Sequence, residues 1–437
     1  MSDTLKAFRG DILHFLGDPA QMPSEKSYQY LEDGLMLVHN GRIEALGKAE
    51  EMLADLPAGT EVIHHTDGLI APGFIDTHIH YPQTEMIGSY GEQLLEWLDT
   101  YTFPTETQFK DREYASQRAE FFLDQLLSNG TTTALVFGTV HPESVDAFFE
   151  HAQAKNLRMI CGKVLMDRNA PEELTDCADS GYEQSKALIE KWHGRDRLQY
   201  AVTPRFAPTC SSEQMHRAAE LLKEYPDVYM HTHLSENANE VVWVSELFPD
   251  SKHYLDAYDQ HGLLGKRSVF AHGIHLCEDE CQRLAESQSA LSFCPTSNLF
   301  LGSGLFNLKQ AEQYNIKVGL GTDVGAGTSF SILQTLNEAY KTQQLRGEKL
   351  TPLKSFYLAT LGGARALDLD DKIGNFTVGK EADFVVLDYK ATPLMDLRMQ
   401  QCRDLMERLF VLSILGDDRA IRATYVMGEQ AHQRDEK

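Results

Sequence analysis

The middle of the chain alternates short apolar segments with longer polar ones, and this rhythm restricts the possible folds more than any other feature. Eight apolar segments typical of buried β-strands occupy residues 69–80, 131–139, 158–166, 198–206, 228–235, 268–274, 289–295 and 317–323. Helix-like segments lie between them, among them residues 113–127, 144–154, 182–192, 212–224 and 308–314. Strands that alternate with helices form parallel sheets, and eight strands close such a sheet into a barrel. The pattern therefore predicts an α/β fold with a (β/α)8 TIM barrel, although an open doubly wound sheet has the same rhythm.

Both ends of the chain carry a second pattern, in which short β-like runs are not separated by helices. These runs occupy residues 35–38, 43–46, 382–387 and 424–427. An Asn-Gly pair separates the first two runs, which is typical of a β-hairpin. We therefore expect a small β-sandwich domain assembled from residues 1–68 and 373–437, attached to a barrel of residues 69–372.

The composition narrows the possible partners and the compartment. The 437 residues include 40 Lys and Arg against 65 Asp and Glu, which gives a net charge of −25. Such a charge repels a phosphate backbone, so a nucleic-acid partner is not expected. The seven cysteines include no Cys-x-x-Cys pair, which favours free thiols in a reducing compartment. With no signal-like amino terminus and no long apolar stretch, the sequence predicts a cytoplasmic protein that does not enter a membrane.

The first apolar segment, residues 69–80, ends in two histidines that are spaced to bind one metal ion. Side chains alternate along a strand, so His78 and His80 point to the same face, about 7 Å apart along the backbone. Two imidazoles placed in this way can reach one ion. The pair alone is weak evidence of a metal site, because a chain with 17 histidines contains such pairs by chance.

Further polar side chains stand at the ends of other predicted strands. They are Arg205, His231, His233, His272 and Asp323. Active sites of (β/α)8 barrels lie at the carboxyl ends of the strands, so we expect these side chains to meet at one mouth of the barrel. A single histidine is more often a core or surface residue, and Asp323 alone could cap the next helix. The coincidence of several such positions favours a metal site.

Several motifs carry a resemblance to a known family. The segment Pro72-Gly-Phe-Ile-Asp-Thr-His-Ile-His80 resembles the first-strand motif of the amidohydrolase superfamily of metal-dependent hydrolases. More narrowly, the chain resembles the guanine deaminases at residues 80–83, 204–208, 231–237, 294–298 and 321–327. The resemblance extends from about residue 30 to residue 430. It implies a distorted barrel with a β domain built from both termini, and a homodimer.

The resemblance implies that His78, His80, His233 and Asp323 bind one Zn²⁺ per chain. Three imidazoles and a carboxylate leave one position open for water, as a catalytic zinc site requires. Iron is not excluded, because it accepts the same ligands. His231 lies on the same strand face as His233 but deeper, so we expect it to support a ligand or to pack in the core.

The resemblance also implies that a purine is held by side chains at the barrel mouth. These are His80, Gln83, Arg205, Phe206, His233, Glu236, His272 and Asp323. Three of them are expected to be catalytic. Asp323 takes the proton of the attacking water, His272 orients that water, and Glu236 protonates N3 and then the leaving amino group. The products are xanthine and ammonia. Arg205 is a fixed fork of donors that suits the O6 edge of guanine.

Three alternatives remain open on the sequence alone. A sister deaminase of the same fold acts on a pterin, 8-oxoguanine or a triazine. A two-metal hydrolase of cyclic amides uses a modified lysine, for which Lys163 is a candidate on a different strand from that of the relatives. A catalytically silent barrel is disfavoured because all four ligands are present. We expect the long insertion at residues 81–112 to form a lid or an interface.

Overall fold

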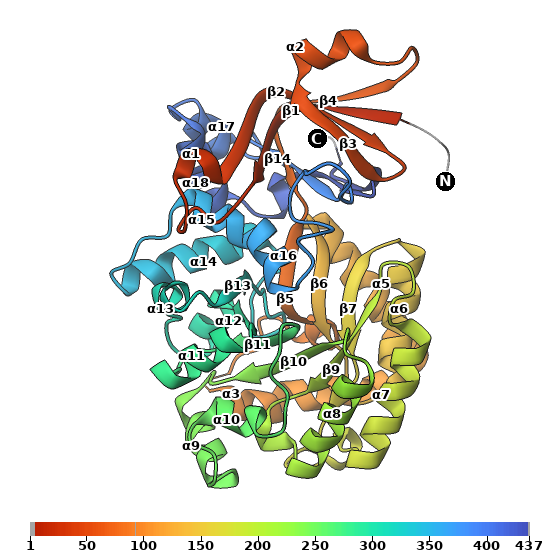
Figure 1. Ribbon diagram of the computed structural model, residues 1–437, viewed down its shortest axis with the longest axis vertical. Coiled ribbons are helices and arrows are strands. Elements are labelled where there is room, and N and C mark those ends of the chain that lie inside the picture. Colours follow the sequence, from red (N-terminus) through yellow and green to blue (C-terminus); the bar gives the residue numbers. More distant parts are fainter. Residues whose placement is uncertain (1–4, 92, 436–437) are drawn as a thin grey trace.

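The computed structural model describes residues 5–91 and 93–435. Its two sheets lie one above the other, with a sheet built from the chain termini at the top of Figure 1 and a barrel below it. Within the described residues, no helix combines the length and the apolar character that a membrane crossing needs.

The barrel is a ring of parallel strands that follow one another in sequence order. They are β5 (Phe74–His80), β6 (Thr131–Phe137), β7 (Arg158–Gly162), β9 (Gln199–Pro204), β10 (Tyr229–Leu234), β11 (Ser268–His272), β12 (Ala290–Phe293) and β13 (Lys317–Leu320), with the short β8 (Val164–Leu165) beside β9. The ring closes just beyond β13, where the amide of Asp323 donates to the carbonyl of His78 and the amide of His80 donates to the carbonyl of Val324, both at 2.9 Å. The barrel prediction is confirmed, and the doubly wound sheet is wrong because its strand order would reverse.

Helices surround the barrel and bury its outer face. They are α5 (Arg112–Ser128), α6 (Pro142–Ala154), α7 (Ala178–Trp192), α8 (Ser212–Glu224), α9 (Ala238–Leu247), α10 (Tyr254–Asp259), α11 (Glu278–Glu286), α12 (Pro295–Phe300), α13 (Leu308–Gln313), α14 (Ile332–Leu345), α15 (Pro352–Tyr357) and α16 (Gly363–Ala366). Helix α5 begins where the carboxylate of Asp111 accepts the amides of Glu113 and Tyr114, which are otherwise unpaired. Apolar residues one helical turn apart, such as Phe122 and Leu126, turn one face of α5 inward.

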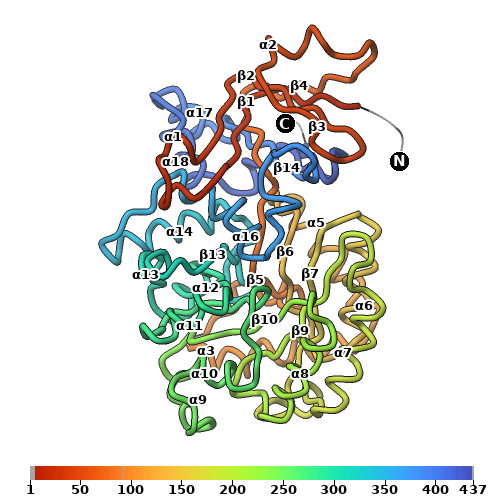
Figure 2. The backbone as a smooth tube through the Cα atoms, in the orientation of Figure 1, coloured from red at the N-terminus to blue at the C-terminus, as the bar shows by residue number. Residues whose placement is uncertain are grey.

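The terminal sheet has the strand order β16-β15-β14-β4-β1-β2-β3. The strands are β1 (Leu5–Phe15), β2 (Tyr28–His39), β3 (Arg42–Lys48), β4 (Glu61–Pro72), β14 (Phe384–Asp388), β15 (Ile421–Val426) and β16 (Glu429–Gln433), accompanied by the helices α1 (Ser24–Ser27), α2 (Ala49–Met52), α17 (Pro393–Met399) and α18 (Leu405–Leu415). Figure 2 shows the two ends of the chain together in this upper part. Phe8 from one terminus packs its ring 4.8 Å from that of Phe384 from the other. The sheet built from both termini is confirmed and is consistent with a small β-sandwich, whereas the exact domain limits stay a prediction.

The prediction that residues 69–80 form one barrel strand is wrong, because Gly73 divides this segment between the two sheets. Residues up to Pro72 belong to β4 and pair with β14, whereas β5 of the barrel begins at Phe74. A side chain at Gly73 would meet the hydroxyl oxygen of Thr132 at 2.1 Å, so only glycine fits this crossing. The apolar run is continuous across both strands, and its pattern therefore does not reveal the change of sheet.

Buried ion pairs join the amino ends of the barrel strands to the terminal sheet. Arg158, the first residue of β7, donates from Nε to Glu381 at 2.7 Å. Arg197, which precedes β9, donates to Glu381 at 2.8 Å and also contacts Asp383. All four side chains are buried. The opposite end of the barrel remains available for the site described next.

Candidate active site

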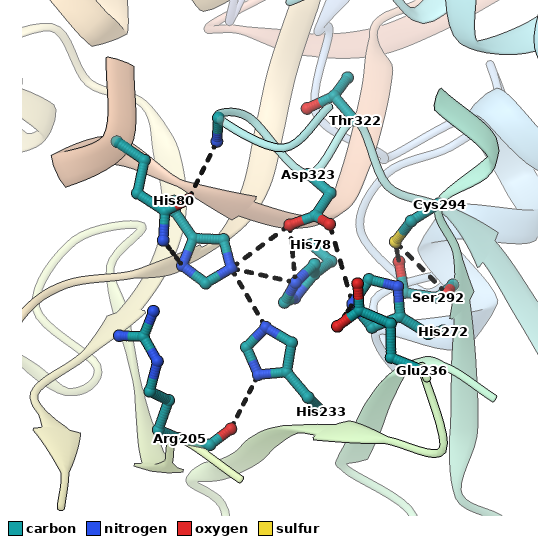
Figure 3. A network of polar contacts seen from close by, with 12 residues as sticks. His78, His80, Arg205, His233, Glu236, His272, Ser292, Cys294, Thr322 and Asp323 are labelled. Atoms are coloured by element: carbon teal, nitrogen blue, oxygen red, sulfur yellow. Dashed lines mark hydrogen bonds and ion pairs between the residues drawn. The ribbon is translucent and has the colours of Figure 1, made fainter. Parts of the chain in front are cut away.

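Four side chains from distant parts of the sequence point at one place at the carboxyl ends of the strands (Figure 3). The Nε2 atom of His80 lies 3.2 Å from Nε2 of His78 and 3.3 Å from Nε2 of His233. Asp323 places Oδ1 at 3.2 Å from Nε2 of His78 and 3.3 Å from Nε2 of His80. Ligand atoms at the corners of a tetrahedron with zinc-length bonds lie about 3.3–3.4 Å apart. These four atoms therefore have the spacing that one zinc-sized ion requires.

The other nitrogen of each ligand ring contacts protein atoms, so the rings are held in place. Nδ1 of His78 lies 2.8 Å from Nε2 of His231, as expected for a histidine that supports a ligand. Nδ1 of His233 lies 2.7 Å from the carbonyl oxygen of Arg205. Burial lowers the pKa of His80 to about 3, which keeps its ring neutral. Neutral imidazole is the form that binds metal ions.

Asp76 joins the two segments that carry the predicted ligands. Its carboxylate accepts the amide of Thr322 at 3.1 Å, the hydroxyl of Thr322 at 2.5 Å and the amide of His78 at 3.2 Å. Burial raises its pKa to about 7, in opposition to these hydrogen bonds. Sequence reasoning assigned no role to Asp76, although an acidic residue inside an apolar strand was the available signal. It fixes Asp323 beside the histidines of β5.

His272 lies next to the four ligand atoms. Its Nδ1 atom is 2.9 Å from Oδ1 of Asn298, and its Nε2 atom faces Oδ2 of Asp323 at 3.7 Å and Oε2 of Glu236 at 3.4 Å. A grouping with His272 in place of His80 also has ligand atoms within 4.8 Å of one another. His80 fits the tetrahedral spacing better, because its Nε2 atom is within 3.3 Å of three partners. His272 therefore stands beside the ion position, facing the second oxygen of Asp323.

Glu236 lies in the loop after β10, with its carboxyl group buried in the site. Burial, together with the negative charges of Asp323 and Glu240, raises the pKa of Glu236 well above its usual range. The loop is held by Glu240, which accepts the amides of Glu236 at 2.9 Å and Asn237 at 3.0 Å. Sequence reasoning missed Glu240. The signal was a capping box, since Asn237 begins α9 and an acidic residue follows three positions later.

The ligand cluster opens into a pocket of about 380 Å³. It is lined by His80, Gln83, Leu94, Trp97, Leu98, Arg205, Phe206, His233, Glu236, Asp323 and Ala326. This volume is at the small end of the range for small-molecule sites and suits a single flat heterocycle. Leu94, Trp97 and Leu98 come from the insertion at residues 81–112, through α3 (Leu94–Trp97) and η3 (Leu98–Thr102), and sequence reasoning did not place them here.

The predicted substrate-binding side chains lie where the sequence places them. Gln83, in the turn η2 (Tyr81–Met86), and Arg205, just beyond β9, both line the pocket. Phe206 also lines it and packs edge-on against Trp243, with 6.2 Å between the ring centroids. Each of the eight predicted contacts is thus in the pocket or, for His272, adjacent to it.

Lys163 does not join the cluster. Its ammonium group forms a buried ion pair with Asp176 at 2.5 Å and donates to the carbonyl of Val164 at 3.2 Å. A lysine engaged in this way has no place as a bridge between two metal ions. The two-metal alternative is disfavoured by this contact.

Comparison with known proteins gives the class of the protein. Residues 69–431 match the amidohydrolase family, and the chain belongs to this family. It is 57% identical over 434 residues to the guanine deaminase of Escherichia coli (strain K12), covering 99% of this chain and 98% of that protein. Among solved structures, E. coli guanine deaminase has a TM-score of 0.95 and 55% identity over 99% of this chain and 100% of that one. A guanine deaminase from C. acetobutylicum with bound guanine has a TM-score of 0.88 and 30% identity over 98% and 100% of the two chains.

Proposed function

We propose that this protein is a zinc-dependent guanine deaminase, which converts guanine and water to xanthine and ammonia. The observation that carries the proposal is the set of four donor atoms at tetrahedral spacing, with the buried acid Glu236 and His272 beside them. The similarity to guanine deaminases over nearly the whole chain supports the choice of substrate.

The donor set suits a catalytic metal ion. His78, His80, His233 and Asp323 would hold the ion, and three nitrogens with one oxygen are typical of zinc. Zinc held by such ligands lowers the pKa of a water molecule to about 7. Zinc rather than iron, a cytoplasmic location and a homodimer stay predictions of the sequence.

Two side chains handle the attacking water. Asp323 uses Oδ1 toward the histidines and has Oδ2 directed at His272, so Oδ2 is the base that accepts the water proton. The Nε2 atom of His272 is directed into the site because Nδ1 is engaged by Asn298. His272 thus orients the water by a single hydrogen bond.

Glu236 supplies the proton that the ring needs. Because its pKa is raised well above the usual range, it is protonated at neutral pH. It donates this proton to N3 of guanine, and the ring then accepts the water oxygen at C2. The proton taken from water moves to the exocyclic amino group, the C2–N bond breaks, and ammonia leaves. One water is consumed and one ammonia is released for each xanthine.

Two further side chains orient the base. Arg205 directs its guanidinium group toward the 6-oxo edge, and Phe206 offers an aromatic face to the ring. The apolar side chains Leu94, Trp97 and Leu98 cover the pocket and exclude bulk water from it.

Ammonia release from a panel of substrates tests the proposal. The zinc-loaded protein is incubated with guanine, pterin, 8-oxoguanine and an aminotriazine, and kcat/KM is measured for each. We expect guanine to have the highest value and to yield xanthine and ammonia in equal amounts. Absence of guanine turnover by zinc-loaded protein contradicts the proposal, and preference for another member of the panel assigns a sister activity.

A further inference from the structure

A buried carboxylate outside the pocket contacts two of the side chains that line it. Glu106 is the last residue of α4 (Phe103–Glu106), in the insertion, and is 1% exposed. Its Oε2 atom accepts from Nη1 of Arg205 at 2.7 Å, and its Oε1 atom accepts from Nε2 of Gln83 at 3.0 Å. Each carboxylate oxygen therefore holds one pocket side chain from behind. We propose that Glu106 is a positioning residue that sets the geometry of purine recognition, an inference that rests on the proposed function.

The contacts of Arg205 explain why its position depends on α4. The guanidinium group is buried, and its central carbon lies 5.4 Å from the ring centroid of Phe103. Phe103 and Glu106 thus contact the same cation from one helical turn, by an aromatic face and by a carboxylate. A buried guanidinium needs such a partner, because desolvation of an unpaired charge is unfavourable. With Nη1 engaged by Glu106, the remaining donors of Arg205 are available to a carbonyl oxygen in the pocket.

The contacts of Gln83 fix its amide in one orientation. Its Nε2 atom donates to Glu106, and its Oε1 atom accepts the amide of Gly325 at 3.2 Å. A carboxylate accepts hydrogen bonds but does not donate them, so the amino end of this amide must face Glu106. The same Nε2 atom lies 3.2 Å from Nδ1 of His80. Glu106 thereby connects the recognition side chains to the ligand cluster.

The first test compares two substrates in Glu106→Gln. Glutamine keeps the size but replaces one acceptor by an amino group that faces a donor of Arg205 or Gln83. We expect kcat/KM for guanine to fall about 10- to 100-fold, as for other supporting residues of polar sites. For 2-aminopurine, which has the amino group but lacks the 6-oxo group, we expect a change of less than about threefold, because its turnover makes no use of the Arg205 contact. An equal fall for both substrates would mean a merely structural role and would overturn the inference.

Matched variants control this comparison. Glu96→Gln removes an exposed carboxylate of the same insertion and is expected to behave as the wild type. Glu106→Asp keeps the charge and both acceptors, so it should recover part of the guanine activity. Zinc content and thermal midpoint are measured for every variant. In Arg205→Met the loss of guanine activity should already include that of Glu106→Gln, so the double variant should fall no further. Additive losses would contradict the proposed coupling.

A crystal structure of Glu106→Gln separates this inference from the proposed function. If the wild-type protein does not deaminate guanine, the proposed function fails whatever the variant does. The positions of Arg205 and Gln83 in the variant then decide the inference independently. We expect both side chains to move from the positions they have here. Unchanged positions would overturn the inference even if guanine is the substrate.

Discussion

The backbone amide of Glu236 donates a 2.9 Å hydrogen bond to the buried carboxylate of Glu240. The other oxygen of Glu240 accepts the hydroxyl of Tyr254 at 2.6 Å. Glu240 belongs to the first turn of α9, so the start of this helix sets the position of the loop that carries the proposed proton donor. Both the place and the acidity of Glu236 depend on this neighbour.

Glu240→Gln is expected to lower kcat for guanine about 10- to 100-fold, because the loop loses one of its acceptors. It should also move the pH profile. Burial and the charge of Asp323 still raise the pKa of Glu236 in the variant, but the contribution of Glu240 is lost, so this pKa falls. Glu236 acts in its protonated form, and activity is lost as the pH rises through its pKa. The basic limb of the kcat profile should therefore move to lower pH, and a shift to higher pH would refute this account.

Glu236→Gln is expected to lower kcat by at least about 100-fold, which is typical of the loss of a general acid. Zinc content should stay at one ion per chain, because Glu236 is not among the four ligands. Glu246→Gln, an exposed change in the same helix region, serves as the control and should keep full activity. Metal content is measured by atomic emission and turnover by xanthine formation. Retained activity would exclude Glu236 as the proton donor, and loss of zinc would make it a ligand.

The ion pairs between the barrel and the terminal sheet predict a large effect on stability. Glu381→Gln leaves the buried Arg158 and part of the contacts of Arg197 without a carboxylate, which should lower the free energy of unfolding by about 3–5 kcal/mol. Glu429→Gln removes the exposed ion pair with Lys6 and should cost no more than about 1 kcal/mol. Urea denaturation of both variants compares the two effects. Equal, small effects would show that the buried pairs do not hold the two sheets together.

The contribution of Glu381 also depends on pH. Burial opposes its ionisation, but the hydrogen bond from Arg158 and the charge of Arg197 outweigh burial, so the pKa of Glu381 is lowered. A carboxyl group with a lowered pKa stabilises the folded state above its unfolded pKa of about 4.3, and this stabilisation is lost as the pH falls through the folded pKa. The difference in stability between wild type and Glu381→Gln should therefore be constant near pH 7 and decrease below about pH 4.

The ligand cluster was predictable because strand geometry determines it. Alternation along a strand places His78 and His80 on one face, and the common direction of parallel strands brings His233 and Asp323 to the same end. The recognition of Gln83 and Arg205 depended instead on resemblance to a family. The contacts now observed agree with both arguments.

Other features had no regular pattern to predict them. Glu106 lies in an insertion of short, irregular helical turns, which give no hydrophobic period from which to infer its contacts with Arg205. The passage from the terminal sheet to the barrel at Gly73 lies within one apolar run, because residues on both sides are buried. Such long-range pairings depend on tertiary packing, which local sequence does not encode.

Titration of the metal-free protein with Zn²⁺ tests the central claim most directly, namely that one ion held by His78, His80, His233 and Asp323 enables guanine deamination. Xanthine formation is measured at each zinc-to-chain ratio after removal of metal with a chelator. The account predicts no activity without metal and a linear rise that ends at one ion per chain, with neither binding nor activity at that ratio in Asp323→Ala. Activity in the metal-free protein, or a rise that ends at two ions per chain, would contradict it.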